Sequence, residues 1–359
     1  MSWLGLTDHH DGRFAPSGLG KFRHRRTGSA QMERGTFMFE TRVPGQVRPH
    51  DLVGYSKTCP WPRELMFRAI PGGGIAMVHR HNTDVTHAAL QWAGDGRAHS
   101  LRVTYAWDNS QGWARLALEQ PAGGALRYEI APAQHPKCTG DLRDFMLGGD
   151  GRILSNDVVF CAASNTVSPI GPMPTLHLST PIATPTGYQT AGRLQRGDMV
   201  LTETGVRVPV LHTARLTVPA RGSFAPVRLR APYFGLTRDI IVAPEQRLVL
   251  RGSEVEYNFG QEAVLVPARH VINGNAAIWA PPSALVTYVQ VVLPGHEALL
   301  AAGCALESMY IGRIRRDRPR LEMSVLADAP RQSLPEHARP FHQVLRPFEA
   351  ITLLDQRAA

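Results

Sequence analysis

Residues 237–270 constrain the fold of this 359-residue chain more than any other stretch. They read TRDIIVAPEQRLVLRGSEVEYNFGQEAVLVPARH: a β-branched run at 239–242 and an apolar run at 248–250 flank Ala-Pro-Glu-Gln-Arg, and a third run follows at 263–266. Short Val/Ile/Leu-rich runs between turn residues are typical of strands. The chain also has 33 Gly and 28 Pro, so we predict an all-β fold rather than long helices.

The length of the chain predicts two domains and a tail. We expect, in chain order, an N-terminal arm at 1–31, a β-sandwich at 32–165, a Pro/Ser linker at 166–174, a second β domain at 175–315, and a basic, Pro-rich tail with a final strand at 316–359. We expect the final strand in the apolar stretch Ala-Ile-Thr-Leu-Leu that begins at residue 350.

The first domain is predicted from strand patterns. Residues 36–43 alternate apolar and polar side chains, and 99–108 and 113–119 flank a turn as in a hairpin. The succession GTFMFETRV, HSLRVTYAWD, WARLALE and VVFCAAS is similar to the concanavalin-A-like lectin and glucanase family, including its laminin-G-like members. This resemblance implies a jelly-roll β-sandwich, a fold that often binds sugars on its concave face or at its rim loops.

The second domain carries motifs in a definite order. PIATPTG at 181–187 and LQRGDMVLT at 194–202 precede the 237–270 stretch. Over about 175–315 the order and spacing resemble the bacterial Hint (hedgehog/intein-like) family, which reads Cys-led strand, ATP-x-G, L-x-x-GD-x-V-x-T, D-x-x-V-S-P-x-H-R and VPARH. The resemblance implies a self-cleaving β domain. Its first residue attacks the preceding peptide carbonyl, and a histidine protonates the departing nitrogen.

This chain departs from the family at the positions that do the chemistry. An ungapped alignment places Thr175 where the family has its cysteine, and the S-P-x-H element has become Ala243-Pro244-Glu245-Gln246. A further family histidine, in Y-x-H, is replaced by Gln290. A threonine hydroxyl is a weak nucleophile without a base, and a glutamine cannot transfer a proton at pH 7. We therefore predict that Thr175, Ala243, Gln246 and Gln290 form an inactive version of the family's catalytic site.

Several alternatives stay open at this point. The domain could still cleave itself near Pro174–Thr175, with His177 or His212 in place of the missing imidazole. His270 and His296 fall at framework positions of the family, and we expect them to be structural.

A metal site is the alternative for a group of histidines in the first domain. His79, His81 and His87 could gather on one sheet face near Asp84 and bind a metal, but we favour a solvated, hydrogen-bonded rim. We predict no metal and no cofactor.

The cysteines are Cys59, Cys138, Cys161 and Cys304. They form no C-x-x-C pair, which makes zinc and redox sites poor interpretations. We expect free thiols, buried at Cys161 and Cys304 where the neighbours are apolar, with disulfides as the alternative.

The net charge is +9, with basic clusters at 21–26 and 313–320. These are either solvated turns or an attachment to a glycan or another acidic polymer. We do not expect nucleic-acid binding, because aromatic residues do not interleave with either cluster. We find neither a membrane-spanning run nor a signal peptide at the first residues, so cytoplasmic location and export without a signal peptide both stay open.

Together these patterns predict a Hint-domain-containing protein that is a non-catalytic β module presenting the N-terminal sandwich. The alternatives are active autoprocessing and a carbohydrate-binding or adhesion protein of the cell envelope or exterior.

Overall fold

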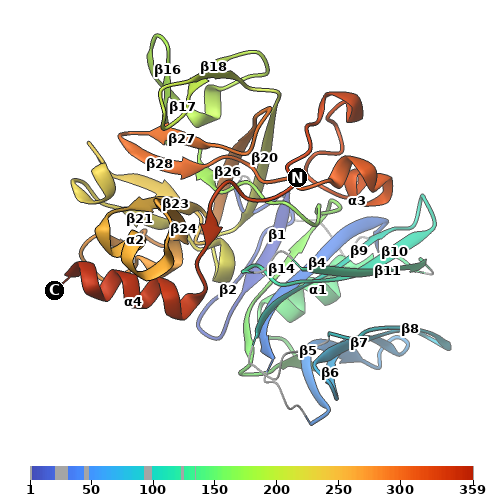
Figure 1. Ribbon diagram of the computed structural model, residues 1–359. Coiled ribbons are helices and arrows are strands. Elements are labelled where there is room, and N and C mark those ends of the chain that lie inside the picture. The colour runs from blue at the N-terminus through green and yellow to red at the C-terminus, as the bar shows by residue number, and fades with distance from the viewer. Residues whose placement is uncertain are drawn as a thin grey trace. The chain divides into compact units, whose positions relative to one another are not determined.

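The computed structural model describes residues 2–20, 31–43, 48–92, 99–122, 125–133 and 135–358. The chain divides into two compact units, Met1–Ile170 and Gly171–Ala359. Both are built mainly from strands, which confirms the all-β prediction (Figure 1). No described helix is both long enough and apolar enough to span a bilayer.

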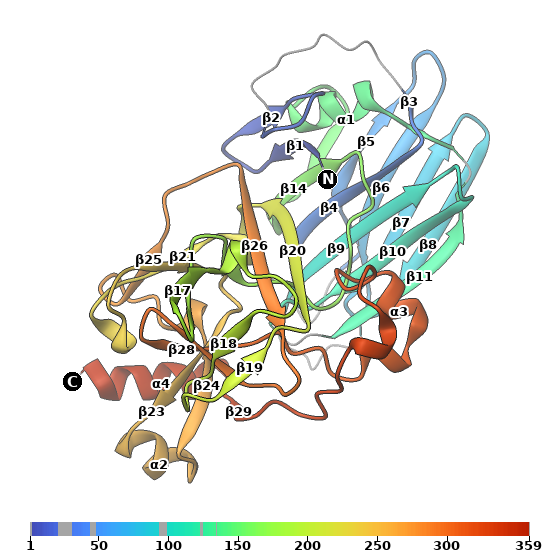
Figure 2. The same cartoon turned by 90° about the horizontal axis from the view of Figure 1, so that it is seen from above.

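The N-terminal unit is a sandwich of two main sheets. Its elements are β1 (Trp3–Thr7), β2 (Gly12–Phe14), β3 (Gln31–Met32), β4 (Arg34–Val43), β5 (His50–Lys57), β6 (Arg63–Ile70), β7 (Gly74–His81), β8 (Asp84–Leu90), β9 (His99–Asp108), β10 (Trp113–Glu119), β11 (Leu126–Pro132), β12 (Lys137–Cys138), α1 (Thr139–Met146), β13 (Arg152–Leu154) and β14 (Val158–Ser164). One sheet has the order β11-β10-β9-β4-β14-β1-β2 and the other β13-β5-β6-β7-β8, while β3 and β12 form a separate pair. Figure 2 shows strands β5 to β8 running side by side.

Aromatic rings join the two main sheets of the sandwich. Phe37 and Phe39 of β4 and Phe67 of β6 are at most 1% exposed. The Phe67 ring stacks on Phe37 at 5.8 Å and meets Phe39 edge-on at 5.1 Å. Each buried phenylalanine stabilises the fold by ~1.5–3 kcal/mol, so this cluster is a major part of the core.

The N-terminal segment differs from the expected arm at 1–31. All five residues of β1 are buried, and the strand pairs antiparallel with β14 on one side and β2 on the other. The alternation of apolar and polar side chains that predicts a half-buried strand is absent here, because Trp-Leu-Gly-Leu-Thr is apolar almost throughout. The basic cluster at 21–26 lies outside the described residues.

The expected linker at 166–174 is partly built into the first unit. Thr36 donates its hydroxyl hydrogen to the Thr166 carbonyl at 2.8 Å and accepts the Ser168 N–H at 2.8 Å. Arg115 donates to the Ser168 carbonyl at 2.7 Å. The division after Ile170 falls within the expected linker, while the other domain limits stay predictions.

The C-terminal unit is also built from sheets. Its strands are β15 (Leu176–His177), β16 (Pro181–Thr184), β17 (Gly187–Thr190), β18 (Met199–Leu201), β19 (Arg207–Pro209), β20 (His212–Pro219), β21 (Val227–Leu229), β22 (Ile240–Val242), β23 (Arg247–Arg251), β24 (Ala263–Pro267), β25 (Ala277–Trp279), β26 (Leu285–Val292), β27 (Ala298–Ala301), β28 (Cys304–Glu307) and β29 (Gln343–Val344). Its helices are α2 (Ser253–Phe259), α3 (Arg318–Glu322) and α4 (Pro347–Ala358). The sheet orders are β20-β26-β15-β22-β21-β25 and β17-β16-β27-β28-β23-β24-β29, with β18 and β19 as a pair.

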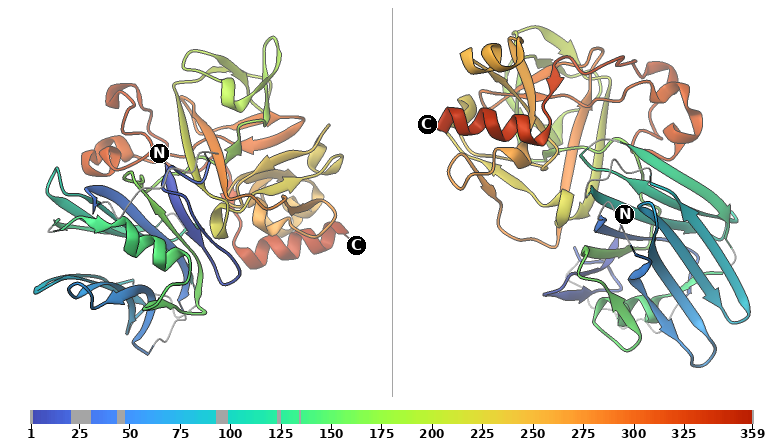
Figure 3. Two further views of the ribbon diagram at one scale, coloured as in Figure 1. Left: turned by 180° about the vertical axis from the view of Figure 1, so that it is seen from behind. Right: turned by 60° about the horizontal axis from the view of Figure 1, so that its bottom comes forward.

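Residues 350–354 lie in helix α4, so the position expected for the final strand is wrong, although the tail does add a last strand at β29. Ala350 and Leu353 are buried while Ile351 and Thr352 are exposed, which is a helical period rather than a strand period. Pro347 occupies the first helical position, and the Glu349 carboxylate accepts the Arg346 N–H at 2.7 Å, as in a capping box. Figure 3 shows α4 beside α2, which it contacts. Among the described residues of the tail, β29 is the segment that pairs with a sheet, parallel to β24.

Candidate functional site

Thr175 immediately precedes β15, a central strand of the six-stranded sheet. Leu176, the next residue, pairs with Val242 of β22 on one side and with Val289 of β26 on the other. This places Thr175 beside the residues that follow β22 and next to Gln290 of β26. The Ala243 N–H donates to the Thr175 carbonyl at 2.7 Å, so Ala243 contributes its backbone to the site and its methyl group no polar contact.

Three of the four predicted site residues meet through their side chains. The Thr175 hydroxyl donates to Gln246 Oε1 at 2.6 Å. Gln290 Nε2 donates to Thr175 Oγ1 and to Gln246 Oε1, each at 3.1 Å. We call these three side chains the amide cluster. Gln246 and Gln290 are 1% and 3% exposed, so the cluster is closed off from bulk water on the amide side.

The amide cluster is anchored on the backbone of the other sheet. The Glu307 carbonyl, at the end of β28, accepts from Gln246 Nε2 at 3.1 Å and from Gln290 Nε2 at 3.0 Å. Gln246 Nε2 also donates to the Arg247 carbonyl at 3.0 Å. Each such bond contributes ~0.5–1.5 kcal/mol net. Gln290 Oε1 is buried without a hydrogen-bond partner, which is a cost within the same cluster.

The charged groups nearest the amide cluster are already occupied. The Glu307 carboxylate lies 2.8 Å from an Arg247 guanidinium nitrogen and 3.0 Å from His296 Nε2, although the histidine contact lacks hydrogen-bond alignment. His296 Nδ1 accepts the Phe341 N–H at 3.2 Å, so the ring proton resides on Nε2, facing Glu307. His296 is therefore engaged by Phe341 and Glu307, and its structural role stays a prediction.

His177 and His212 are the histidines expected as possible substitutes for the family's imidazole. His177 Nδ1 is engaged with the Ser179 hydroxyl at 2.7 Å, and His212 lies opposite Val292 at one end of β20. No hydrogen bond joins either ring to Thr175 among the described residues. Burial lowers the pKa of both rings. Burial, and secondly the Arg269 charge, lowers the pKa of His270 to about 4.

Sequence reasoning missed the Glu307 side of the site. The carboxylate of Glu307 contacts Arg247 and His296, and none of the family motifs includes this residue. Glu307 ends a short strand, Cys304–Glu307, that carries no local motif. Its position becomes visible only through the pairing of β28 with β23.

The three histidines of the alternative metal site, His79, His81 and His87, do not all share one face of the sheet. His79 and His81 do share a face of β7, but their partners across β8 are Thr86 and Asp84, so His87 points to the opposite face. His135 instead stacks on His81 at 4.3 Å and lies 3.0 Å from an Asp84 oxygen. The described residues contain no group of three or more side chains suited to a metal ion.

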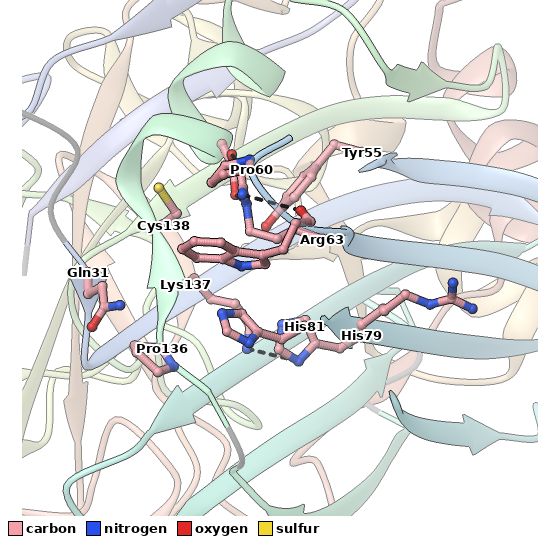
Figure 4. A pocket seen from close by; sticks show the side chains of 12 residues that line it. Gln31, Tyr55, Pro60, Arg63, His79, His81, Pro136, Lys137 and Cys138 are labelled. Atoms are coloured by element: carbon pink, nitrogen blue, oxygen red, sulfur yellow. Dashed lines mark hydrogen bonds and ion pairs between the residues drawn. The ribbon is translucent and has the colours of Figure 1, made fainter. Parts of the chain in front are cut away.

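The same face borders a cavity of about 250 Å³, which sequence reasoning did not find. Its lining includes Tyr55, Trp61, Arg63, His79, His81 and Lys137 (Figure 4). Lys137 comes from β12, whose partner strand β3 is more than a hundred residues earlier in the chain.

All four cysteines are free thiols, and Cys161 and Cys304 are buried as expected. Burial raises the pKa of Cys304 to about 12, and it raises that of Cys161 further. Neither thiol belongs to the amide cluster.

The geometry around Thr175 defines a class: two-sheet β modules in which the first strand starts at a largely buried polar cluster whose residues are far apart in sequence. Residues 174–313 match the family described as Hint domain, and the C-terminal unit contains a Hint domain. No curated protein matches the chain.

Three solved structures illustrate the similarities. The MchDnaB-1 intein is 17% identical over 37% of this chain and 98% of its own, with a TM-score of 0.27. The gp41-1 intein is 14% identical over 38% of this chain and 98% of its own, also with a TM-score of 0.27. The CBM40 of the Ruminococcus gnavus IT-sialidase is 15% identical over 46% of this chain and 88% of its own, with a TM-score of 0.28.

Proposed function

We propose that the Hint domain of this chain does not cleave itself and serves as a rigid β module that carries the N-terminal sandwich. The observation that supports this most directly is the 2.6 Å hydrogen bond in which the Thr175 hydroxyl donates to the Gln246 amide oxygen. The position expected to hold a catalytic histidine therefore holds the acceptor of a neutral hydrogen bond.

Cleavage would require the Thr175 oxygen to attack the Pro174 carbonyl and to lose its proton as it does so. Both side chains bonded to this hydroxyl are primary amides, which do not take up a proton near neutral pH. Glu307 meets the cluster through its backbone carbonyl, while its carboxylate contacts Arg247 and His296. General acid–base assistance contributes roughly 10²–10⁴-fold to such reactions, and no described group is placed to supply it.

The nitrogen that departs from the Pro174 carbonyl also lacks a suitable proton donor among the described residues. It must be protonated as the peptide bond breaks, and Gln246 Nε2 is directed to the Arg247 and Glu307 carbonyls instead. The cluster is thus well suited to hold three segments together and poorly suited to move protons. This supports a structural role over the autoprocessing alternative.

The basic cluster at 313–320 fits a structural role for the same unit. Arg315 and Arg316 pair with Glu336 at 2.7 and 2.6 Å, Arg318 pairs with Glu322, and Arg320 with Asp317. These arginines are largely neutralised by neighbours, which favours the solvated-turn interpretation over attachment to an acidic polymer.

The test is the intact mass of the purified full chain after prolonged incubation with hydroxylamine or a thiol. We expect one species at 39.4 kDa under every condition. Two fragments that divide at Thr175 would overturn the proposal.

A matched pair of variants separates the lost groups from the retained fold. The triple change Thr175→Cys, Ala243→Ser, Gln246→His restores a thiol nucleophile and an imidazole, and we expect slow thiol-stimulated cleavage from it. Thr175→Cys alone keeps the Gln246 amide and should remain intact.

A further inference from the structure

The cavity of the N-terminal unit lies where the inner face of the five-stranded sheet changes from apolar to polar. Leu65 and His79 are register partners near the core, and Arg63 and His81 are the next pair on the same face. The volume of about 250 Å³ is slightly below the ~300–1,000 Å³ usual for drug-sized ligands. It fits one small ring with its substituents.

Lys137 is the unusual group in this cavity. It is 3% exposed, and its Nζ donates to the His135 carbonyl at 3.0 Å and lies 3.4 Å from His79 Nδ1 (Figure 4). The amine also lies over the rings of Tyr105 and Trp107, at 5.4 and 5.3 Å from their centroids. These contacts orient the amine and give it cation–π stabilisation of ~0.5–2 kcal/mol.

No described carboxylate pairs with Lys137. Asp141, the acidic residue of the cavity, is held by Arg63 at 2.8 Å and by Lys57 at 3.6 Å. A buried amine with only neutral partners is costly to keep charged. An anionic ligand that reaches Nζ would supply the missing counter-charge.

Trp61 gives the cavity a fixed aromatic wall. Its side chain is 42% exposed, although the Arg63 guanidinium lies 5.5 Å from the ring centroid and His81 meets it edge-on at 5.9 Å. A tryptophan held in place by two neighbours and still open to solvent is a ready surface for the C–H face of a sugar ring.

We propose that this cavity binds a sugar acid, with its carboxylate at Lys137 Nζ and its ring against the Trp61 indole. The ligand is either a free uronic acid or the terminal residue of an acidic glycan, which share this chemistry. The site lies wholly in the N-terminal unit, so the proposal does not depend on whether the Hint domain is inactive.

Proton linkage follows from the burial of the amine. Burial lowers the pKa of Lys137 to about 7, and a bound carboxylate favours its charged form. Affinity should therefore be highest below pH 7 and fall roughly tenfold per pH unit above it. The titratable or charged groups around the amine are Tyr55, Arg63, His79, His81, Tyr105, His135, Cys138 and Asp141.

Site-specific amine labelling tests the carboxylate contact on the full chain. The sequence has only three lysines, Lys21, Lys57 and Lys137, so acetylation can be followed peptide by peptide in a mass spectrometer. We expect D-galacturonate to protect Lys137 and to leave Lys57 unchanged. D-Galactose differs at one carbon and lacks the carboxylate, and it should protect neither. Acetate tests whether a small carboxylate without a sugar ring protects Lys137. Trigalacturonate tests whether the end of an acidic glycan protects it.

The outcomes are distinct. Protection of Lys137 by galacturonate but not by galactose or acetate supports a sugar acid, and stronger protection by trigalacturonate assigns the glycan end. Equal protection by galactose, equal protection by acetate, or no protection by galacturonate would each overturn the proposal.

Two variants check the same contacts by ligand-detected NMR. Lys137→Met keeps the hydrocarbon stem over the aromatic rings and should abolish galacturonate binding, while thermal unfolding shows that the fold persists. Trp61→Ala should weaken binding at least tenfold. Trp279→Ala is the matched control, because Trp279 is 52% exposed in the other unit. Unchanged binding by Lys137→Met would contradict the assignment of the carboxylate.

Discussion

Replacing Gln246 with leucine should destabilise the C-terminal unit, because this one amide joins three segments. Its oxygen accepts from Thr175 and Gln290, and its nitrogen donates to the Arg247 and Glu307 carbonyls. If the amide cluster is structural, this change should show in stability.

The size of the stability loss depends on which hydrogen-bonding partners of Gln246 can find another partner. After the change, Gln290 Nε2 still serves both Thr175 Oγ1 and the Glu307 carbonyl. The Thr175 hydroxyl loses its acceptor, and the Arg247 carbonyl loses its side-chain donor; Pro267, the residue opposite Arg247, has no N–H to offer. Two unsatisfied groups at ~1–3 kcal/mol each, one of them half-buried, give a loss of about 2–4 kcal/mol in the free energy of unfolding.

Peptide-resolved hydrogen exchange measures this loss without mixing the two units. Amides of β15, β22 and β26 that exchange by opening of the unit should exchange roughly 30- to 1,000-fold faster, since 1.4 kcal/mol corresponds to a factor of ten. Peptides of the N-terminal unit should be unchanged. Gln261→Leu is the matched control, because Gln261 is exposed in the same unit. If the two variants exchange alike, the amide cluster does not stabilise the fold and the reasoning fails.

Two further predictions concern other parts of the chain. Burial, followed by the Lys137 charge, lowers the pKa of His79 to about 3; since the unfolded state binds the proton first, the contribution of neutral His79 to the stability of the N-terminal unit is full above pH 6.5 and should fall by roughly 3 kcal/mol between pH 7 and pH 4. Urea unfolding at the two pH values checks this, and His79→Asn should reduce the difference. Leu353→Ala should lower the free energy of unfolding of α4 by ~2–5 kcal/mol, because Leu353 is fully buried. Ile351→Ala, on the exposed side of the helix, should change this free energy little. Hydrogen exchange of α4 peptides distinguishes the two variants.

Motif order was sufficient to bring Thr175, Gln246 and Gln290 together. Each lies in or beside a short strand whose place in the sheet is set by the apolar run next to it, so order along the chain translated into proximity. The same reasoning could not find Glu307 or Lys137. Both are positioned by pairing between strands remote in sequence, β23 with β28 and β3 with β12, and neither has a local signal.

The errors at the two ends of the chain have separate physical reasons. Residues 350–354 include β-branched side chains, and that composition favoured a strand although Pro347 and Glu349 already gave a helix start. Trp3–Thr7 is buried throughout, so it shows no alternation from which a strand could be predicted. His87 was misplaced by a register that depends on the β7–β8 turn.

The pairing of β1 with β14 determines when the seven-stranded sheet can be completed during translation. Ser164 donates its hydroxyl hydrogen to the Ser2 carbonyl, a contact 162 residues apart in sequence. During translation β1 must therefore wait, with its edge toward β14 unpaired, until residue 164 has left the ribosome. Until then this apolar edge is available to chaperones, and a segment fused directly before Trp3 would hinder the step that completes the seven-stranded sheet.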